Sequence, residues 1–229
     1  WPGLGARLRS FLDTVQGARE RSWLFWRGAE ISVAVPLEDR IAWVEEGLSM
    51  GPSSRSEPGL RYTLGQLLLD ADRGDEALRY LADYERAFTL RNGFHVNGDQ
   101  LGVGLSGFRY RPFTLEGNFL AMEAVHEMLL RSRGHSVQVF PAVPEAWKDV
   151  SFRGLRAEHG YVVDAERRAG VTTRVHVTAT QAGTLRLRNP FPAGAAVQAS
   201  RPTAQGEDPT EVLCDLAAGA TLELTLVEA

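Results

Sequence analysis

The sequence predicts an α+β multidomain protein, with a helical domain over residues 1–134 followed by a C-terminal antiparallel β-sandwich over residues 135–229. Two observations support this division. Before Gly134, apolar residues recur every three or four positions, which is typical of one face of an α-helix. After Gly134, apolar and polar residues alternate in short runs, as in strands that bury one face. Several such runs separated by Gly, Pro and Asn turns favour a sandwich.

Amphipathic segments predict five helices in the first domain. A short turn at Asp72–Asp75 joins the third to the fourth, and so short a connection favours an antiparallel helical hairpin. In the last helix, the spacing places Phe119, Met122, Val125 and Leu129 inward, and Glu123 and Glu127 outward. The five expected helices cover residues 4–16, 37–48, 60–71, 76–90 and 119–131.

A long irregular segment interrupts the helices at residues 91–115. It contains five glycines and Pro112, which oppose regular structure. Loops of this length are usually functional or disordered. Aromatic residues within it, such as Phe94 and Phe108, argue against disorder. The segment is therefore expected to line an open pocket at one end of the helical domain.

Eight strands are expected in the second domain. The clearest is 171–180. In it, every second residue from Val171 to Val177 is Val or Thr and is expected on one face, and the residues between them are Thr, Arg and His. The expected strands cover residues 137–140, 150–156, 161–166, 171–180, 184–188, 196–199, 211–216 and 221–227.

Composition excludes several classes of function. A net charge of −4, without a cationic block, predicts no nucleic-acid partner and no anionic membrane partner. No apolar run reaches the roughly 20 residues that a membrane helix needs. Cys214 is the only cysteine, so no intrachain disulfide or cysteine-based metal site is expected. Neither a cytoplasmic nor a secreted location is indicated. The opening Trp1-Pro2-Gly3 is typical of a fragment or processed chain.

No cofactor or metal is expected. Residues 102–107 match G-x-G-x-x-G, but a dinucleotide site needs a preceding strand and a helix that begins within the motif. Pro112 follows too soon to allow that helix, so we reject a nucleotide site. There is also no His-Glu-x-x-His and no acidic cluster at metal-ligand spacing.

Three ordered motifs resemble glycoside hydrolase family 95, which includes the α-L-fucosidases. The first, at 113–119, has an aromatic residue, an acidic residue and Gly-Asn-Phe before a helix that closes in Glu-Met-Leu-Leu. The second, at 139–147, is similar to the family's Pro-Ala-x-Pro-x-x-Trp. The third, at 150–157, is similar to its Gly-Leu-Arg-Ala strand. The resemblance is clearest over 113–190.

The resemblance implies an (α/α)6 toroid followed by a β-sandwich, and an inverting hydrolase that cleaves a terminal glycosidic bond. About five helices could supply only the closing part of the toroid, so a missing N-terminal part of the same polypeptide is an expected partner. Inverting hydrolysis needs two carboxyl groups, one of which activates water. The resemblance assigns this general-base role to Glu116, where the fucosidase pattern has Asp. The family's general acid has no matching motif in this chain.

Other residues near Glu116 are candidates for binding an oligosaccharide or glycoconjugate substrate. Asn118 is interpreted either as a sugar or water ligand or as the N-cap of the helix at 119–131. Arg109, Tyr110 and Phe113 could line a sugar subsite, since aromatic faces stack on pyranose rings and Arg donates to hydroxyls. His95 is a further candidate ligand. Asp99 is interpreted chiefly as a turn residue. Glu116 itself could instead be a partner of the helix dipole.

Two other functions stay open at this stage. The chain could be a non-catalytic carbohydrate-binding or scaffold fragment. It could also belong to a phosphorylase or lyase built on the same toroid. Release of free sugar without phosphate would exclude the phosphorylase.

Overall fold

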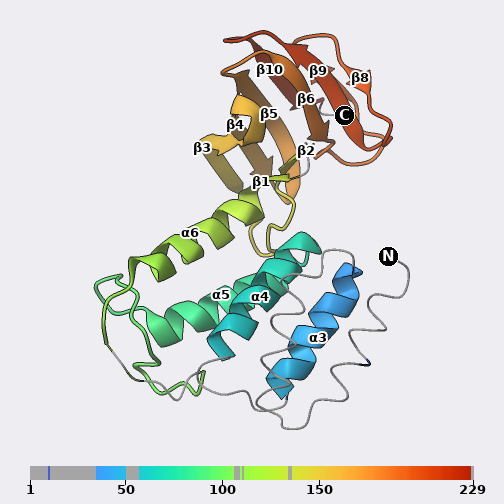
Figure 1. Ribbon diagram of the computed structural model, residues 1–229. Coiled ribbons are helices and arrows are strands. Elements are labelled where there is room, and N and C mark those ends of the chain that lie inside the picture. The colour runs from blue at the N-terminus through green and yellow to red at the C-terminus, as the bar shows by residue number, and fades with distance from the viewer. Residues whose placement is uncertain are drawn as a thin grey trace. The chain divides into compact units, whose positions relative to one another are not determined.

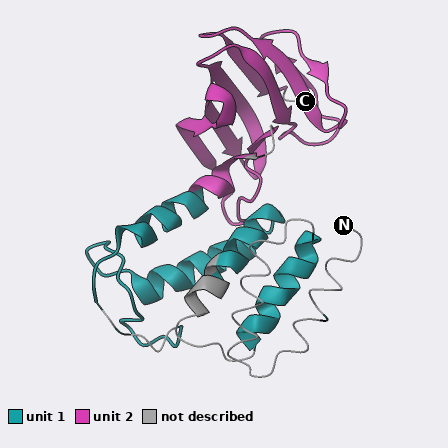
Figure 2. Ribbon diagram, in the orientation of Figure 1, with its two compact units in different colours: residues 1–125 teal, residues 126–229 magenta. Residues whose placement is uncertain are grey.

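The computed structural model describes residues 35–49, 57–105, 109, 111–133 and 136–227, together with Ser10. The chain divides into two compact units, Trp1–Val125 and His126–Ala229 (Figure 2). The predicted helix at 4–16 lies outside the described residues. The domain boundary between residues 134 and 135 stays a prediction, because these units are defined by compactness alone.

The described helices of the first unit are α3 (Leu37–Ser49), α4 (Glu57–Asp70) and α5 (Gly74–Phe88) (Figure 1). Helix α4 packs against both α3 and α5. Their apolar faces bury Val44, Leu64 and Leu68, each at most 1% exposed. The apolar periodicity therefore predicts these three helices correctly, to within a few residues at their ends.

The fourth described helix, α6 (Leu115–Leu129), differs from the prediction in its start and in its exposed face. It begins four residues earlier than the expected Phe119. Phe119 is 57% exposed and Met122 is 66% exposed, so the prediction that both point inward is wrong. With Leu115, at 44% exposed, they lie at positions i, i+4 and i+7 on one helical face. That face is open within the part of the chain that the structure describes.

Strand β1 (Leu130–Arg133) begins inside the helix that the sequence pattern predicts over 119–131, and its first two residues fall within that predicted helix. It pairs antiparallel with β2 (Ser136–Val139). Leu130 is 2% exposed, and the Arg131 side chain donates from Nε to Gln138 Oε1 across the hairpin at 3.1 Å. The strand pairing, which is tertiary, overrides the helical apolar spacing that continues into it.

After the end of α6, the described part of the second unit forms two five-stranded sheets, as the predicted β-sandwich requires (Figure 1). One has the order β1-β2-β6-β9-β8 and the other β3-β4-β5-β10-β7. All pairings are antiparallel except that of β2 with β6, at Val137 and Leu187. The remaining strands are β3 (Val150–Ala157), β4 (Tyr161–Arg168), β5 (Val171–Ala179), β6 (Gly183–Arg188), β7 (Val197–Ala199), β8 (Ala204–Gln205), β9 (Glu211–Leu216) and β10 (Thr221–Leu226).

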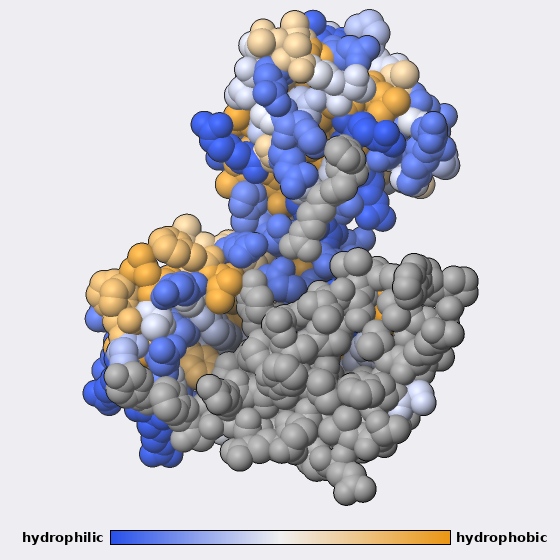
Figure 3. Space-filling model, in the orientation of Figure 1, coloured by the Kyte–Doolittle hydropathy of each residue, from blue (hydrophilic) through white to orange (hydrophobic). Residues whose placement is uncertain are grey.

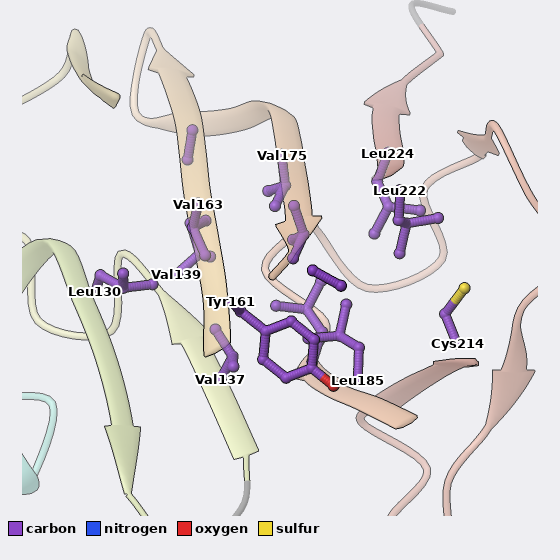
Figure 4. Close-up of a cluster of buried hydrophobic side chains, with 14 of the residues drawn as sticks. Leu130, Val137, Val139, Tyr161, Val163, Val175, Leu185, Cys214, Leu222 and Leu224 are labelled. Atoms are coloured by element: carbon purple, nitrogen blue, oxygen red, sulfur yellow. The ribbon is translucent and has the colours of Figure 1, made fainter. Parts of the chain in front are cut away.

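One hydrophobic core joins the inner faces of the two sheets (Figure 4). Leu185 and Leu187 contribute from the first sheet, and Val163 and Val175 from the second, all at 0% exposed. Alternate residues of β4 are buried, as the period of two in the sequence predicts. The arrangement is that of an antiparallel-rich β-sandwich. Cys214 lies in this core as a free thiol.

Gly154 explains part of the Gly-Leu-Arg-Ala motif. The register between β3 and β4 shifts between Phe152 and Leu155, which marks a β-bulge. Gly154 has φ +69° there, a conformation that glycine adopts without a steric penalty. Its N–H donates to Asp164 Oδ1 at 2.7 Å, so the bulge is held by a side chain of the neighbouring strand.

Candidate functional site

The segment before α6 is paired with the segment after α5. Isolated bridges join Thr89 to His95 and Val96 to Phe113. The Thr114 N–H donates to the His95 carbonyl at 3.0 Å, and the Val96 N–H donates to the Phe88 carbonyl at 2.8 Å. The start of α6 is therefore fixed to the end of α5 through residues 94–97.

Glu116 lies in the first turn of α6, where its side chain is exposed. A carboxylate in this position interacts favourably with the positive end of the helix dipole. It is also open to a ligand from solvent. The location thus agrees with both roles that the sequence leaves open for Glu116.

Gly117 is buried directly against the His95 ring. A Cβ added at residue 117 would lie closer than 3.0 Å to Cγ, Nδ1 and Cδ2 of His95, a separation that real Cβ atoms essentially never show. Glycine is required here for close approach and not for an unusual backbone conformation. The Gly of the Gly-Asn-Phe motif therefore has a steric explanation in the fold.

Asn118 binds backbone groups of the segment that precedes His95. Its Oδ1 accepts the His95 N–H at 3.0 Å, and its Nδ2 donates to the Gly93 carbonyl at 2.7 Å. It lies inside α6, three residues after Leu115, so its interpretation as the N-cap of the helix is wrong. The two hydrogen bonds join residues 23 and 25 positions apart in the sequence.

His95 is 8% exposed and is one of the few buried polar residues in the described part of the chain. Its ring stacks on Tyr84, with centroids 5.2 Å apart and planes inclined by 13°. Its Nδ1 lies 2.5 Å from Thr114 Oγ1. Burial lowers the pKa of His95, against the opposing influence of the hydrogen bond at Thr114 and of the carboxylates of Glu85 and Glu116. The ring is therefore a neutral, packed group near neutral pH.

Asp99 organises the glycine-rich loop. Its Oδ1 accepts the N–H groups of Gly102 and Val103, and its Oδ2 accepts those of Gly104 and Leu105, at 2.8–3.1 Å. Burial acts to raise the pKa of Asp99, but the four backbone N–H groups outweigh it and hold the pKa below its usual value. Both oxygens are thus occupied, which supports the turn interpretation over a second catalytic carboxylate.

Phe94 and Phe113 form an exposed aromatic pair, and Phe113 lies three residues before Glu116 in the sequence. Their ring centroids are 4.8 Å apart in an edge-to-face arrangement, and the residues are 48% and 51% exposed. A contiguous group of exposed apolar side chains is a feature of surfaces that bind a partner or a ligand. Figure 3 shows apolar side chains gathered over α6.

The remaining candidates differ in how the structure places them. Arg109 is exposed, and Tyr110 lies outside the described residues. Arg111 donates from Nε to Gln100 Oε1 at 2.6 Å, which attaches its side chain to the loop that Asp99 holds. Among the described residues, no group of three or more His, Cys, Asp or Glu side chains is arranged to hold a metal ion.

The sequence pattern does not predict the contacts that Phe94, Thr114 and Gly117 make in this region. The first two carry no local signal, because their roles depend on the pairing of residues 94–97 with 112–114. Gly117 does carry one, since a glycine in the first turn of a helix costs stability unless something needs the space.

Comparison with known proteins gives a family match for most of the second unit. Residues 131–224 match the family model described as glycoside hydrolase family 95, C-terminal domain. Residues 131–224, which lie in the second unit, are therefore similar to the C-terminal domain of this family. The match confirms the resemblance that the motifs at 139–147 and 150–157 indicate. Glu116 precedes the matched residues, so its role does not follow from the match.

The other comparisons add little to the family 95 match. A solved structure titled as a family 39 glycoside hydrolase from the gut symbiont Bacteroides cellulosilyticus WH2 aligns with 77% of this chain and 32% of its own chain. The identity is 10% and the TM-score is 0.27, so this likeness supports no structural argument. The chain spans about a third of that structure's length. No curated protein matches the sequence. No described helix has the length and apolarity required to cross a membrane.

Proposed function

We propose that this chain is part of an inverting, α-L-fucosidase-like glycoside hydrolase that cleaves a terminal glycosidic bond, with Glu116 as the general base. The observation that carries the proposal is the exposed Glu116 carboxylate within the motif at 113–119, on a helix start whose flanking residues are hydrogen-bonded to Gly93 and His95. The family 95 C-terminal domain over 131–224 supports it independently. Phe113, Arg109 and Tyr110 are the proposed substrate contacts, and Phe94 joins them through its ring contact with Phe113.

The chemistry assigned to Glu116 is proton removal from water. In inverting hydrolysis, one carboxylate activates a water on the face of the sugar opposite to the leaving group, while a second carboxyl group protonates that group. A solvent-exposed carboxylate can take up the first role. The second carboxyl group is proposed to come from the parent polypeptide, because Asp99 has both oxygens occupied and no motif for the acid matches elsewhere in this sequence.

The helices α3–α6 are proposed to be the closing part of an (α/α)6 toroid completed by the same polypeptide. The open face formed by Leu115, Phe119 and Met122 supports this, because three apolar residues along one helical face are typical of a helix–helix contact. Met122→Ser should leave the stability of the 229-residue chain unchanged within about 0.5 kcal/mol. In the complete enzyme it should cost about 1–3 kcal/mol, since a polar group would then be buried. Equal effects in the two proteins would contradict the toroid contact.

The test of function uses the complete parent enzyme and an aryl α-L-fucoside. Glu116→Gln keeps the shape but removes the base, and turnover should fall about 10²–10⁴-fold. Substrate binding should change little, because a base acts chiefly in the transition state. Proton NMR of the first product formed should show inversion at the anomeric carbon.

Glu116→Asp restores the fucosidase pattern at this position and is the more informative variant. Higher α-L-fucosidase activity in that variant would mean that the longer side chain tunes a fucosidase-like site. Unchanged turnover in both variants would instead favour the helix-dipole role of Glu116. If binding to immobilised oligosaccharide then depended on Phe94 and Phe113, the chain would be a carbohydrate-binding fragment.

A further inference from the structure

We propose that Asn118 and His95 are positioning residues that fix the start of α6 and thereby aim Glu116, and that neither contacts the substrate. This rests on the proposed role of Glu116 as the base. It reassigns two residues whose types alone suggest sugar ligands. The neighbours of Glu116 on both sides are attached to residues 93–95, the His95 segment.

The residues that flank Glu116 are each held by that one short segment. On the N-terminal side, Thr114 donates its N–H to the His95 carbonyl and places its Oγ1 2.5 Å from the ring Nδ1. On the C-terminal side, Gly117 lies against the ring itself. Asn118 then accepts the His95 N–H and donates to the Gly93 carbonyl. The backbone of Glu116 is therefore held from both directions while its side chain stays in solvent.

The chemistry of the two side chains fits a positioning role. The Asn118 amide uses its one acceptor oxygen and one of its donors on backbone groups, as a neighbouring β-strand would. An Asp could not donate to the Gly93 carbonyl, and a Gln would be one methylene too long for both bonds. The His95 ring is 8% exposed, stacked on Tyr84 and tilted on Phe88 with centroids 6.0 Å apart. A ring enclosed in this way cannot reach a sugar hydroxyl.

A solvent-exposed general base needs a backbone that is held in place by other residues. The first turn of a helix lacks internal partners for its N–H groups and frays easily. Catalytic side chains must be held to within about 0.5 Å, and a misplacement of about 1 Å can cost about 10²-fold in rate. Removal of Asn118 should therefore lower turnover by loosening the backbone that carries Glu116.

The decisive experiment is a double-mutant cycle on kcat in the complete parent enzyme, with an aryl α-L-fucoside as substrate. Asn118→Ala alone should reduce kcat about 10–100-fold with KM changed less than about threefold. In the Glu116→Gln background the same change should reduce kcat less than about twofold, because there is no longer a base to aim. Asn92→Ala is the matched control. Its Oδ1 accepts the Phe94 N–H at 3.2 Å in the same turn but does not reach α6, so kcat should stay unchanged.

The outcomes separate the two proposals. A full, independent loss of kcat from Asn118→Ala in the Glu116→Gln background, or a rise in KM without a fall in kcat, would show direct substrate contact and overturn the positioning role. Unchanged turnover in Glu116→Gln itself would remove the proposed function, and the positioning role with it.

A second measurement needs no activity and uses the 229-residue chain. Amide hydrogen exchange at His95 should accelerate at least tenfold in Asn118→Ala, because Oδ1 is the acceptor for that N–H. Exchange in the first turn of α6 should accelerate as well. Unchanged exchange at both places would show that Asn118 does not hold the helix start, and would overturn the proposal whatever the kinetics.

Discussion

Gly117→Ala should destabilise the first unit, although alanine is normally the better residue in a helix. The added methyl group would lie closer than 3.0 Å to three atoms of the His95 ring. Neither partner can move freely. The ring is stacked on Tyr84 and bonded to Thr114, and the backbone of α6 is attached to Gly93 and His95 through Asn118. Either the ring leaves its stack or the helix start moves away from the segment that holds it.

The expected magnitude follows from two opposing effects. Overpacking a tight site usually costs about 1–3 kcal/mol, and a lost hydrogen bond between His95 and Thr114 adds about 1 kcal/mol. Replacement of glycine by alanine inside a helix returns at most about 1 kcal/mol. The net loss should therefore be about 1–3 kcal/mol in the free energy of unfolding of the first unit.

Gly65→Ala in α4 is the matched control. A Cβ added at Gly65 meets nothing within 4 Å, and the residue is helical. This substitution should stabilise the protein by about 0.4–1 kcal/mol. Hydrogen exchange of the slowest amides in α5 reports both effects, since about 1.4 kcal/mol corresponds to a tenfold change in opening. Equal protection in the two variants would refute the steric role assigned to Gly117.

Three further predictions concern other parts of the fold. Asp99→Asn leaves one acceptor oxygen for four N–H groups, so it should lower the free energy of unfolding by about 2 kcal/mol. Limited proteolysis within residues 101–105 should become faster. An unchanged cleavage rate would contradict the role of Asp99 in holding this loop. Because the folded state lowers the pKa of His95, the unfolded chain binds more protons. Between about pH 6.5 and about pH 5, thermal stability of the first unit should therefore fall as pH drops, and this part of the pH dependence should vanish in His95→Gln. Leu185→Ala should lower the unfolding free energy of the sandwich by about 2–5 kcal/mol, and the exposed Val227→Ala by less than about 0.5 kcal/mol, both read from urea midpoints.

The sandwich was the part of the fold most accessible from the sequence. Each of the eight expected strands is present, because burial of one face imposes a period of two on the chain. The structure adds β1 and the two-residue β8. Strand β1 was missed because Leu129 and Leu130 continue the helical spacing of α6, and only the partner strand decides where the helix ends. The local sequence pattern of a segment does not show which strand it pairs with in the folded protein.

The start of α6 shows a second limit. A Gly-Asn pair is unfavourable in a helix, so propensity places the first turn after it, at Phe119. In the structure the same two residues lie inside α6, because Gly117 admits the His95 ring and Asn118 binds residues more than 20 positions earlier. Position and exposure of Glu116 could be anticipated from the motif. The attachment that surrounds it could not, since it depends on long-range contacts.

The parallel pairing of β2 with β6 affects the order in which the sandwich folds and the point at which it can be cut from the rest of the chain. Strands β1 and β2 form a local hairpin, but they join their sheet only where Val137 meets Leu187, 50 residues later. That step closes a long loop and should be late and slow relative to hairpin formation. A fragment that began after Arg133 would lose β1 and leave β2 as the sheet edge. An open edge with Val137 and Val139 beside it is a template for intermolecular strand pairing, so such a fragment should aggregate where the intact domain stays dispersed.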